Sequence, residues 1–325
     1  MCIKSQTMTQ ETITKSFNSF VGMMAALPDD ASCRTYLESK IWDNGTPTCP
    51  HCGLIDATHY KLTTKGEFKG MYKCKSCKQR FNVLVKTMFE GSHIGLRKWF
   101  IAIYIFSLHK KGISSHQLAS DLSITQKSAW FMLSRIRNAF KQEVPTEKID
   151  GLFHADETYV GGKNKNRHAD KKVEASQGRS LKDKTPVFGL MQTGGQVYTS
   201  VVPNVQAATL KPIIESMVAK GSIIVTDEWL AYKGLSKNFG HVVINHQDNE
   251  YVRGAFHNNN IEGFWSQMKR GIYGIYHQVS PKHLNKYCDE FSFRYNARKA
   301  SITDKFDFSL ENSTRLTYKA LIAKS

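Results

Sequence analysis

The sequence has no hydrophobic run long enough to cross a membrane. Its most apolar stretch, Trp99–Leu108, falls far short of the roughly 20 residues that a membrane-spanning helix needs, so we interpret it as a buried helix. Residues 1–16 lack the apolar segment of a secretion signal, and a cytoplasmic location is therefore expected. Proline is scarce, and no repeat or low-complexity tract interrupts the chain. A length of 325 residues then leaves room for two or more globular domains.

Acidic residues are few relative to basic ones. The chain has 28 Asp and Glu against 45 Lys and Arg, which gives a formal net charge of +17 and a pI near 9.5. An excess of this size favours a polyanionic partner. Nucleic acid is the stronger interpretation, and an anionic membrane is weaker because no basic amphipathic segment stands out. The excess charge can also serve solubility alone.

Cysteine is limited to seven residues, and four of them form two Cys-x-x-Cys pairs. In a chain without a secretion signal, such pairs indicate metal binding more than disulfides, although a redox pair is the alternative. Four thiolates complete the tetrahedral shell of a structural Zn²⁺, and the 21 residues between the pairs allow a β-hairpin. The prediction is a zinc ribbon over residues 46–83, with His51 as a bystander and with the ligands Cys49, Cys52, Cys74 and Cys77.

Helical spacing of apolar residues predicts three consecutive helices over 96–111, 114–122 and 126–140. A short second helix, a tight turn at 123–125 and a longer third helix are typical of a helix-turn-helix. A plain helical connector is the alternative. On the DNA-binding hypothesis, the third helix offers side chains to bases or phosphates. These are Gln126, Lys127, Ser128, Arg135 and Arg137.

From residue 150 the pattern becomes mixed α/β. Strands are expected over 151–162, 185–192, 196–202, 222–227 and 241–245, with helices over 207–219, 258–270 and 281–298 and a short helix between the last two strands. The loop 163–184 between the first two strands is rich in Lys and Arg; it is either simply solvated or a clamp on the DNA backbone. The residues predicted to contact DNA in this half of the chain are Lys163, Lys165, Arg167, Lys171, Lys172 and Arg270.

Three acids in this half occupy positions suited to metal binding. Asp156 lies within a strand, Asp227 ends a buried strand, and Glu262 opens a helix. Each acid alone is more often a surface group or a helix cap. Phosphoryl transfer to water or a 3′-hydroxyl uses two divalent ions about 3.5–4 Å apart, and carboxylates supply the hard oxygen ligands that Mg²⁺ prefers. Two acids from adjacent strands and one from a facing helix can bracket such a pair.

The choice of Glu262 follows from the pattern of its helix. An apolar stripe at helical spacing is expected to pack on the sheet, which places Glu262 and Lys269 at the edge of the buried face. Glu228 would point to the other side of the strand from Asp227. Glu250 lies in a polar loop, and Glu290 is expected to form a surface ion pair with Lys286 or Arg294. The stripe consists of Ile261, Phe264, Trp265 and Met268.

Several segments, in order, resemble the zinc-ribbon insertion-sequence transposases of the fifteen-ninety-five family over roughly residues 17–300. They are CPHCG with CKSC, DETYVGG, VTDEWLAY, HNNNIEGFWSQMKRGIYGIYHQVSPKHL and EFSFRYN. The resemblance implies a DDE catalytic domain of the ribonuclease-H type, with which the expected order β-β-β-α-β-α-β-α agrees. It also implies Asp156, Asp227 and Glu262 as the ligands of Mg²⁺ or Mn²⁺, and Lys269 as the basic residue after the third acid.

The expected fold class is multi-domain, with an N-terminal zinc ribbon and helix-turn-helix followed by an α/β ribonuclease-H-like catalytic domain. The expected function is a transposase that binds the double-stranded ends of an insertion sequence and cleaves and joins strands, as a homo-oligomer on DNA in a bacterial cytoplasm. The alternatives are a non-catalytic DNA-binding regulator derived from a transposase and a structure-selective nuclease. The expected segments are a tail with a short helical segment (1–45), the ribbon (46–83), the helix-turn-helix segment (84–145), the catalytic domain (146–300) and a C-terminal tail (301–325).

Overall fold

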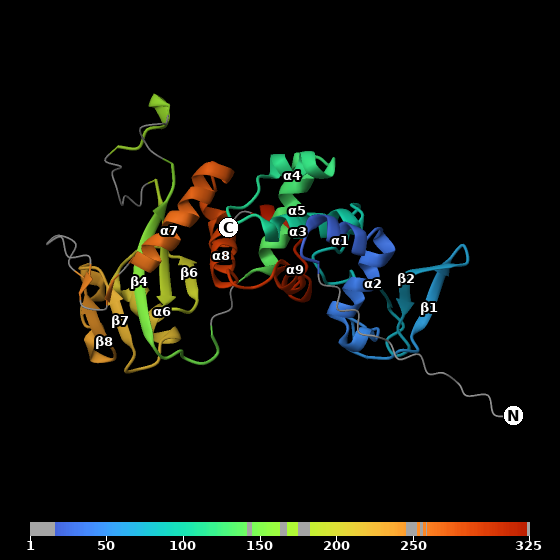
Figure 1. Ribbon diagram of the computed structural model, residues 1–325, viewed down its shortest axis with the longest axis horizontal. Helices are drawn as coiled ribbons and strands as arrows, with labels where there is room; N and C mark the ends of the chain where they lie inside the picture. Colours follow the sequence, from blue (N-terminus) through green and yellow to red (C-terminus); the bar gives the residue numbers. More distant parts are fainter. Residues whose placement is uncertain are drawn as a thin grey trace. The chain divides into compact units, whose positions relative to one another are not determined.

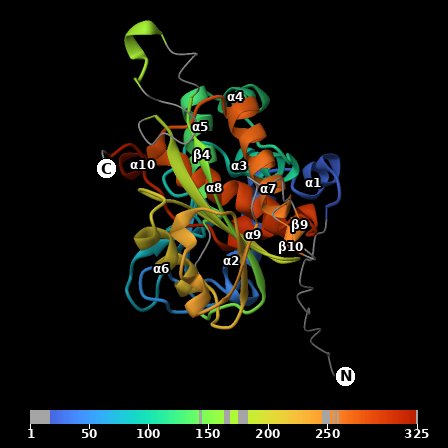
Figure 2. The same ribbon diagram turned by 90° about the vertical axis from the view of Figure 1, so that its left-hand side faces the viewer.

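The computed structural model describes residues 17–141, 145–162, 168–174, 183–244, 252–253, 256–257 and 259–323 (Figures 1 and 2). The chain divides into two compact units. The first comprises residues 1–108, 118–139 and 300–324, and the second comprises 109–117 and 140–299. Among the described residues, no helix has the length and apolar character needed to cross a membrane.

The first unit begins with two short helices, α1 (Phe20–Ala26) and α2 (Asp30–Ile41). Asp29 caps the second helix: its carboxylate accepts the Ser32 N–H at 2.7 Å, and the Ser32 hydroxyl completes a capping box. These contacts satisfy amide groups that the first turn leaves without partners. A 3₁₀ turn, Asp43–Gly45, then leads into the ribbon.

The ribbon is a three-stranded antiparallel sheet in the order β1-β2-β3. Lys65 and Gly66 join the first two strands, and both have positive φ, as the tight turn of a two-residue hairpin requires. Aromatic rings form the core of this sheet, with Tyr72 stacked on Phe81 at a centroid distance of 5.5 Å. The strands are β1 (Tyr60–Thr64), β2 (Glu67–Lys73) and β3 (Arg80–Phe81).

The three helices expected after the ribbon are present as α3 (Leu96–Leu108), α4 (Ser115–Leu122) and α5 (Gln126–Ala139). Ser123, with φ of 50°, makes the turn between α4 and α5. The helices are confirmed as secondary structure, whereas their use as a DNA-binding helix-turn-helix stays a prediction. α3 is buried on most of its surface because it packs against α2, α5 and α9.

The C-terminal segment forms helices where the sequence suggested a tail. α9 (Ile302–Glu311) begins at a capping box of Ser301 and Asp304, and α10 (Tyr318–Ile322) follows. Phe306 and Leu310 of α9 are fully buried, and the Phe306 ring packs against Phe100 at 5.3 Å. The expectation of a tail over 301–325 therefore fails for these two helices. The i, i+4 spacing of Phe306 and Leu310 after a capping serine was the signal for α9.

The second unit contains a five-stranded sheet in the order β6-β5-β4-β7-β8. β4, β5 and β6 pair antiparallel as a meander, whereas β7 and β8 run parallel to β4. β9 (Val252–Arg253) and β10 (Phe256–His257) form a separate two-stranded antiparallel sheet. The strands of the large sheet are β4 (Leu152–Val160), β5 (Thr185–Gln192), β6 (Val197–Val201), β7 (Ile223–Thr226) and β8 (Gly240–Val243).

Helices cover both faces of this sheet (Figure 1). Side chains alternate along β4, so Phe153 and Ala155 share a core with α6 (Ala207–Met217), while Val160 shares the opposite core with α7 and α8. This mixed sheet between helices is the expected ribonuclease-H-like α/β fold. The remaining elements are α7 (Asn259–Gly271), a π-helix (Ile272–Tyr276), α8 (Pro281–Asn296) and the 3₁₀ turns Ala169–Lys171, Leu230–Tyr232 and Leu235–Lys237.

One expectation about α8 is corrected. Glu290 does pair with Arg294, at 2.7 Å, but the pair is buried rather than on the surface, with Glu290 fully inaccessible. The same carboxylate oxygen accepts a hydrogen bond from the hydroxyl of Tyr276, and Arg294 also donates to the carbonyl of His109. Residues far apart in sequence thus cover Glu290, which helical spacing alone does not reveal.

Candidate active site and zinc site

The four cysteines of the two Cys-x-x-Cys pairs converge in the ribbon. Their sulfur atoms all lie within 4.8 Å of one another, with 3.7 Å between Cys49 and Cys77 and 3.6 Å between Cys52 and Cys74. A tetrahedral zinc ion bound at about 2.3 Å requires sulfur–sulfur distances of roughly 3.8 Å. The arrangement therefore fits a structural Zn²⁺, as the sequence predicted.

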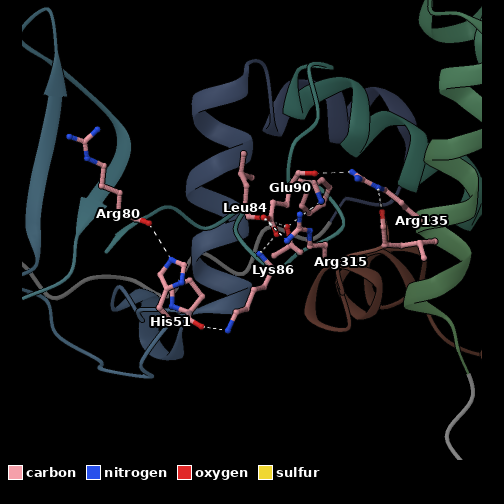
Figure 3. A network of polar contacts seen from close by, with 11 residues as sticks. His51, Arg80, Leu84, Lys86, Glu90, Arg135 and Arg315 are labelled. Carbon is pink, nitrogen blue, oxygen red and sulfur yellow. Dashed lines mark hydrogen bonds and ion pairs between the residues drawn. The ribbon is translucent and has the colours of Figure 1, made fainter. Parts of the chain in front are cut away.

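The loop backbone favours the thiolate form of one of these cysteines. The thiol of Cys52 has its pKa lowered to about 7 by a hydrogen bond from the Leu54 amide, which favours the thiolate that a metal needs. Gly53 and Lys78 follow the two pairs with positive φ, so each loop turns tightly around the sulfurs. His51 is not part of the sulfur cluster, and its ring Nε2 contacts the carbonyl of Arg80 at 3.3 Å, which agrees with its expected bystander role (Figure 3).

The acids of the second unit come together through strand register. His154 of β4 pairs with Val225 of β7, and the same parallel register continued by two residues brings Asp156 beside Asp227. Both aspartates then point to the face of the sheet that carries α7, because side chains alternate along a strand. Glu262 lies in the first turn of that helix. The carboxylates of Asp227 and Glu262 both act electrostatically on Asp156.

Asp156 lies in a buried environment with like charges nearby. Burial raises its pKa to about 6, and the negative charge of Asp227 acts in the same direction. Hydrogen bonds to the charged form oppose this shift: the Glu157 N–H donates to Oδ1 at 2.8 Å, and the indole Nε1 of Trp265 donates to Oδ2 at 3.0 Å. A carboxylate in such a like-charge cluster favours a nearby cation, which is the environment of a metal ligand.

Trp265 is the neighbour of the acids that the sequence analysis missed. The apolar stripe of α7 correctly predicted its burial, but not the hydrogen bond of its N–H to Asp156. A usable signal was present, because a buried indole N–H normally finds an acceptor.

Lys269 lies two turns along α7 from Glu262 and is half-buried. Burial lowers the pKa of its ammonium group, while the charge of Asp156 acts in the opposite direction. Because the charge of Asp156 acts on Lys269, the two side chains lie near each other. Lys269 is thus positioned to carry a positive charge beside the acidic cluster.

The acid next to Asp156 in sequence has a different environment. The Glu157 side chain faces the α6 side of the sheet, where it accepts a hydrogen bond from the buried hydroxyl of Tyr232. Asp227 also accepts the backbone N–H of Trp229 at 3.1 Å, which fixes the turn after β7. Asp156 and Glu157, which are adjacent in sequence, are therefore directed to opposite faces of the sheet.

Within the part of the chain that the structure describes, the four cysteines are the only group of three or more potential ligands with all ligand atoms within 4.8 Å. The three carboxylates are more widely spaced than the ligands of one ion. A pair of ions about 3.5–4 Å apart needs such spacing, since each ion contacts a different part of the ligand set. The donor set, all hard oxygen atoms, fits Mg²⁺ or Mn²⁺.

The residues predicted to contact DNA fall into three groups. Lys127, Lys172 and Arg270 are exposed, with Arg270 donating to the Ser266 hydroxyl at 2.8 Å. Lys163, Lys165 and Arg167 lie outside the described residues, as does the side chain of Lys171. Arg135 and Arg137 are only 6% and 2% exposed, so burial removes them as surface contacts.

Arg135 is instead part of the first unit's interior. Its guanidinium donates to the carbonyls of Met88, Glu90 and Leu316, and Arg137 lies over the ring of Phe106. The correction has a simple physical reason. Every residue of α5 from 132 to 137 is buried, so the helix is covered on all sides there, whereas only its N-terminal turn is exposed.

Two family models match this chain. Residues 148–296 match the ISXO2-like transposase domain, and residues 28–80 match the transposase zinc-ribbon domain. The chain belongs to this family of zinc-ribbon insertion-sequence transposases. Together the two matches cover both sites described above, which lie in the ribbon and in the second unit of this transposase.

Curated relatives of this transposase come from mobile elements or are named after transposases. It is 27% identical over 264 residues to an uncharacterized protein in transposable element ISH50 of Halobacterium salinarum, covering 78% of this chain and 86% of the relative. It is 37% identical over 102 residues to an uncharacterized transposase-like protein of Haemophilus influenzae, covering 31% of this chain and 81% of the relative.

Two solved structures with some likeness contain the Mos1 transposase. One is the Mos1 strand transfer complex, with a TM-score of 0.28 and 13% identity over 63% of this chain and 75% of the other. The second is the Mos1 paired-end complex with the left transposon end, with a TM-score of 0.27 and 14% identity over 64% and 70%. Scores this low support no inference.

Proposed function

We propose that this transposase binds the ends of its insertion sequence and catalyses divalent-metal-dependent cleavage and transfer of DNA strands. The observation that carries the proposal is the meeting of Asp156, Asp227 and Glu262 on one face of the sheet. Three acids drawn from β4, the end of β7 and the first turn of α7 repel one another. Such an arrangement persists in a protein when it serves a bound cation.

In this function Asp156, Asp227 and Glu262 hold the metal ions. Mg²⁺ or Mn²⁺, when bound, supplies stabilisation of the charge that develops on the attacking and leaving oxygens of the phosphate. The protein contributes position more than covalent chemistry, since the nucleophile is a water molecule or a DNA 3′-hydroxyl. The rigid sheet fixes the two aspartates, and α7 brings the glutamate onto them.

Lys269 takes a separate role beside the acids. Its half-buried ammonium group lies in the field of Asp156 and is close enough to the cluster to donate to a DNA phosphate next to it. Holding the phosphate group there would orient the scissile bond relative to the carboxylates. The proposed catalytic residues are thus the three acids and Lys269.

Recognition of DNA is assigned to the ribbon and to the helices α4 and α5. The net charge of +17 supports binding to a polyanion, and Lys127 at the exposed start of α5 is offered to the duplex. Exposed Lys172 and Arg270 add backbone contacts in the catalytic unit. We propose that the protein acts as a homo-oligomer that holds two element ends, in the cytoplasm of a bacterial cell.

The decisive experiment compares Glu262→Gln with Glu228→Gln in a strand-transfer assay containing Mg²⁺. Each variant loses one carboxylate charge and keeps its shape, but only Glu262 belongs to the proposed ligand set. We expect joining to be lost in Glu262→Gln, with end binding retained, and to be near normal in Glu228→Gln. Near-normal joining by Glu262→Gln would refute the assignment.

A non-catalytic DNA-binding regulator is the second candidate, and the same assay separates the two functions. A regulator would bind element ends with high affinity in Mg²⁺ or Mn²⁺ yet give neither cleavage nor joining in the unmodified protein. The intact set of three carboxylates supports the enzyme, because a regulator has no need to keep mutually repelling acids together.

A further inference from the structure

Trp265 lies against the first of the three acids. Its side chain is 4% exposed, and its indole Nε1 donates to Oδ2 of Asp156 at 3.0 Å. The indole can only donate, and the carboxylate is its acceptor. Trp265 lies on the apolar face of α7, and its polar N–H contacts the carboxylate of Asp156, a proposed metal ligand.

A glycine makes room for this contact. Gly189 of β5 is the direct cross-strand partner of Asp156 in the β4–β5 register. A Cβ atom added at Gly189 would lie 2.5 Å from Cζ2 and 2.7 Å from Cη2 of Trp265, closer than real side chains approach. The six-membered ring of the indole thus lies over the bare backbone of Gly189, and the five-membered ring reaches the carboxylate.

Two donors hold the Asp156 carboxylate in one orientation. The Glu157 N–H contacts Oδ1 and the Trp265 N–H contacts Oδ2, so each oxygen has one partner. Each carboxylate oxygen can accept more than one interaction, which leaves capacity on both for a cation. The two contacts restrict rotation of the carboxylate plane without using up its ability to bind metal.

We propose that Trp265 is a positioning residue for the metal-binding carboxylate of Asp156, and that Gly189 provides the space in which its indole lies. This inference rests on the proposed function. Carboxylates that bind metal are commonly oriented by hydrogen bonds from a second set of residues, and loss of such a partner weakens metal affinity or activity roughly 10- to 100-fold.

A packing role alone does not account for the geometry. Trp265 belongs to the apolar core of α7 and lies 5.1 Å from the ring of Phe264. Phenylalanine at position 265 would preserve most of that packing but has no N–H to donate. The substitution Trp265→Phe therefore separates the hydrogen bond from the burial of an aromatic ring.

The first measurement is Mn²⁺ binding to the zinc-loaded full-length protein, followed by calorimetry or by electron paramagnetic resonance. We expect Trp265→Phe to weaken Mn²⁺ binding roughly 10- to 100-fold while the protein stays folded. Trp99→Phe is the matched control. Trp99 is also buried, but it belongs to the first unit and its indole donates to the hydroxyl of Ser92 at 2.9 Å, so Mn²⁺ affinity should not change.

The second measurement retains Trp265 but fills the space next to its indole. Gly189→Ala should displace the indole and weaken Mn²⁺ binding in the same direction. In the ¹⁵N-labelled protein, the Trp265 indole resonance is identified by its absence in Trp265→Phe. It should move in Asp156→Asn, because the hydrogen-bond acceptor loses its charge, and it should broaden when Mn²⁺ is added.

The outcomes separate this inference from the proposed function. Mn²⁺ binding by the wild type that depends on Asp156, but is within twofold the same in Trp265→Phe, overturns the positioning role alone. An indole resonance unaffected by Asp156→Asn overturns it as well. If the wild type shows no Asp156-dependent Mn²⁺ binding, the proposed metal site fails and the role of Trp265 fails with it.

Discussion

Nη1 of Arg135 donates a hydrogen bond to the carbonyl oxygen of Met88 at 2.7 Å. The same guanidinium reaches the carbonyl of Glu90 at 3.1 Å and that of Leu316 at 2.8 Å. One side chain of α5 thus joins three segments: its own helix, the turn that follows the ribbon and the C-terminal segment. The sequence suggested that Arg135 contacts DNA, but this side chain is buried and connects three segments of the first unit.

We therefore expect Arg135→Ala to destabilise the first unit by roughly 3 kcal/mol, because buried hydrogen bonds to a charged group contribute about 1.5–3 kcal/mol each and are not additive. Lys127→Ala on the exposed start of the same helix is the matched variant, and it should weaken DNA binding without changing stability. Chemical denaturation and binding titrations of the two proteins check this. An Arg135→Ala protein of normal stability that had lost only DNA affinity would restore the original assignment.

Zinc removal should affect the two units differently. The binding free energy of a structural zinc site is part of the folding free energy, on the order of 10 kcal/mol. Cys74→Ser should unfold residues 46–83 locally and leave the catalytic unit folded, as measured by hydrogen exchange across the chain. Freshly purified wild-type protein should contain one zinc ion per chain by metal analysis, and its absence would contradict the assignment.

The stability of the metal-free catalytic unit should depend on pH through Asp156. Its folded-state pKa is about 6, above the ordinary value of about 3.9 expected in the unfolded chain. The folded state therefore binds this proton more tightly, so the contribution is fully present below pH about 4 and is lost as the pH rises through 6. The loss is about 3 kcal/mol.

Thermal melting between pH 4 and 7, with zinc bound and without Mg²⁺ or Mn²⁺, measures this effect. Asp156→Asn should flatten the dependence in that window, because the amide does not titrate. Mg²⁺ should restore stability to the wild type above pH 6, since a ligand that binds only the folded state stabilises it. An identical pH profile for the wild type and the variant would show that another group is responsible.

DNA affinity should fall steeply with salt and should depend on the exposed basic residues near the acids. Arg270→Ala is expected to reduce the slope of log affinity against log salt by about 1, for all DNA sequences alike. Lys220→Ala is the control, because Lys220 precedes β7 and so lies at the end of that strand opposite to Asp227. Equal effects of the two substitutions would argue against DNA contact by Arg270.

Local patterns in the sequence were sufficient for the zinc ligands and for the order of the main elements from β1 to α8, whereas the role of the three acids stays a prediction. Cys-x-x-Cys spacing specifies a tetrahedral thiolate site almost independently of the surrounding fold, and the sulfur distances agree with it. Periodicity located α5 and α7 because each helix buries one face.

The tertiary structure alone decided which side chains are free to act. Arg135 and Lys127 belong to one helix, but the C-terminal segment and the turn after the ribbon cover the first and leave the second exposed. The buried pair of Glu290 and Arg294 is contacted by Tyr276 and by the carbonyl of His109. The Trp265 indole of α7 contacts Asp156 of β4 because Gly189 of β5 leaves room for its ring. Burial depends on partners distant in the chain, and a linear pattern does not record them.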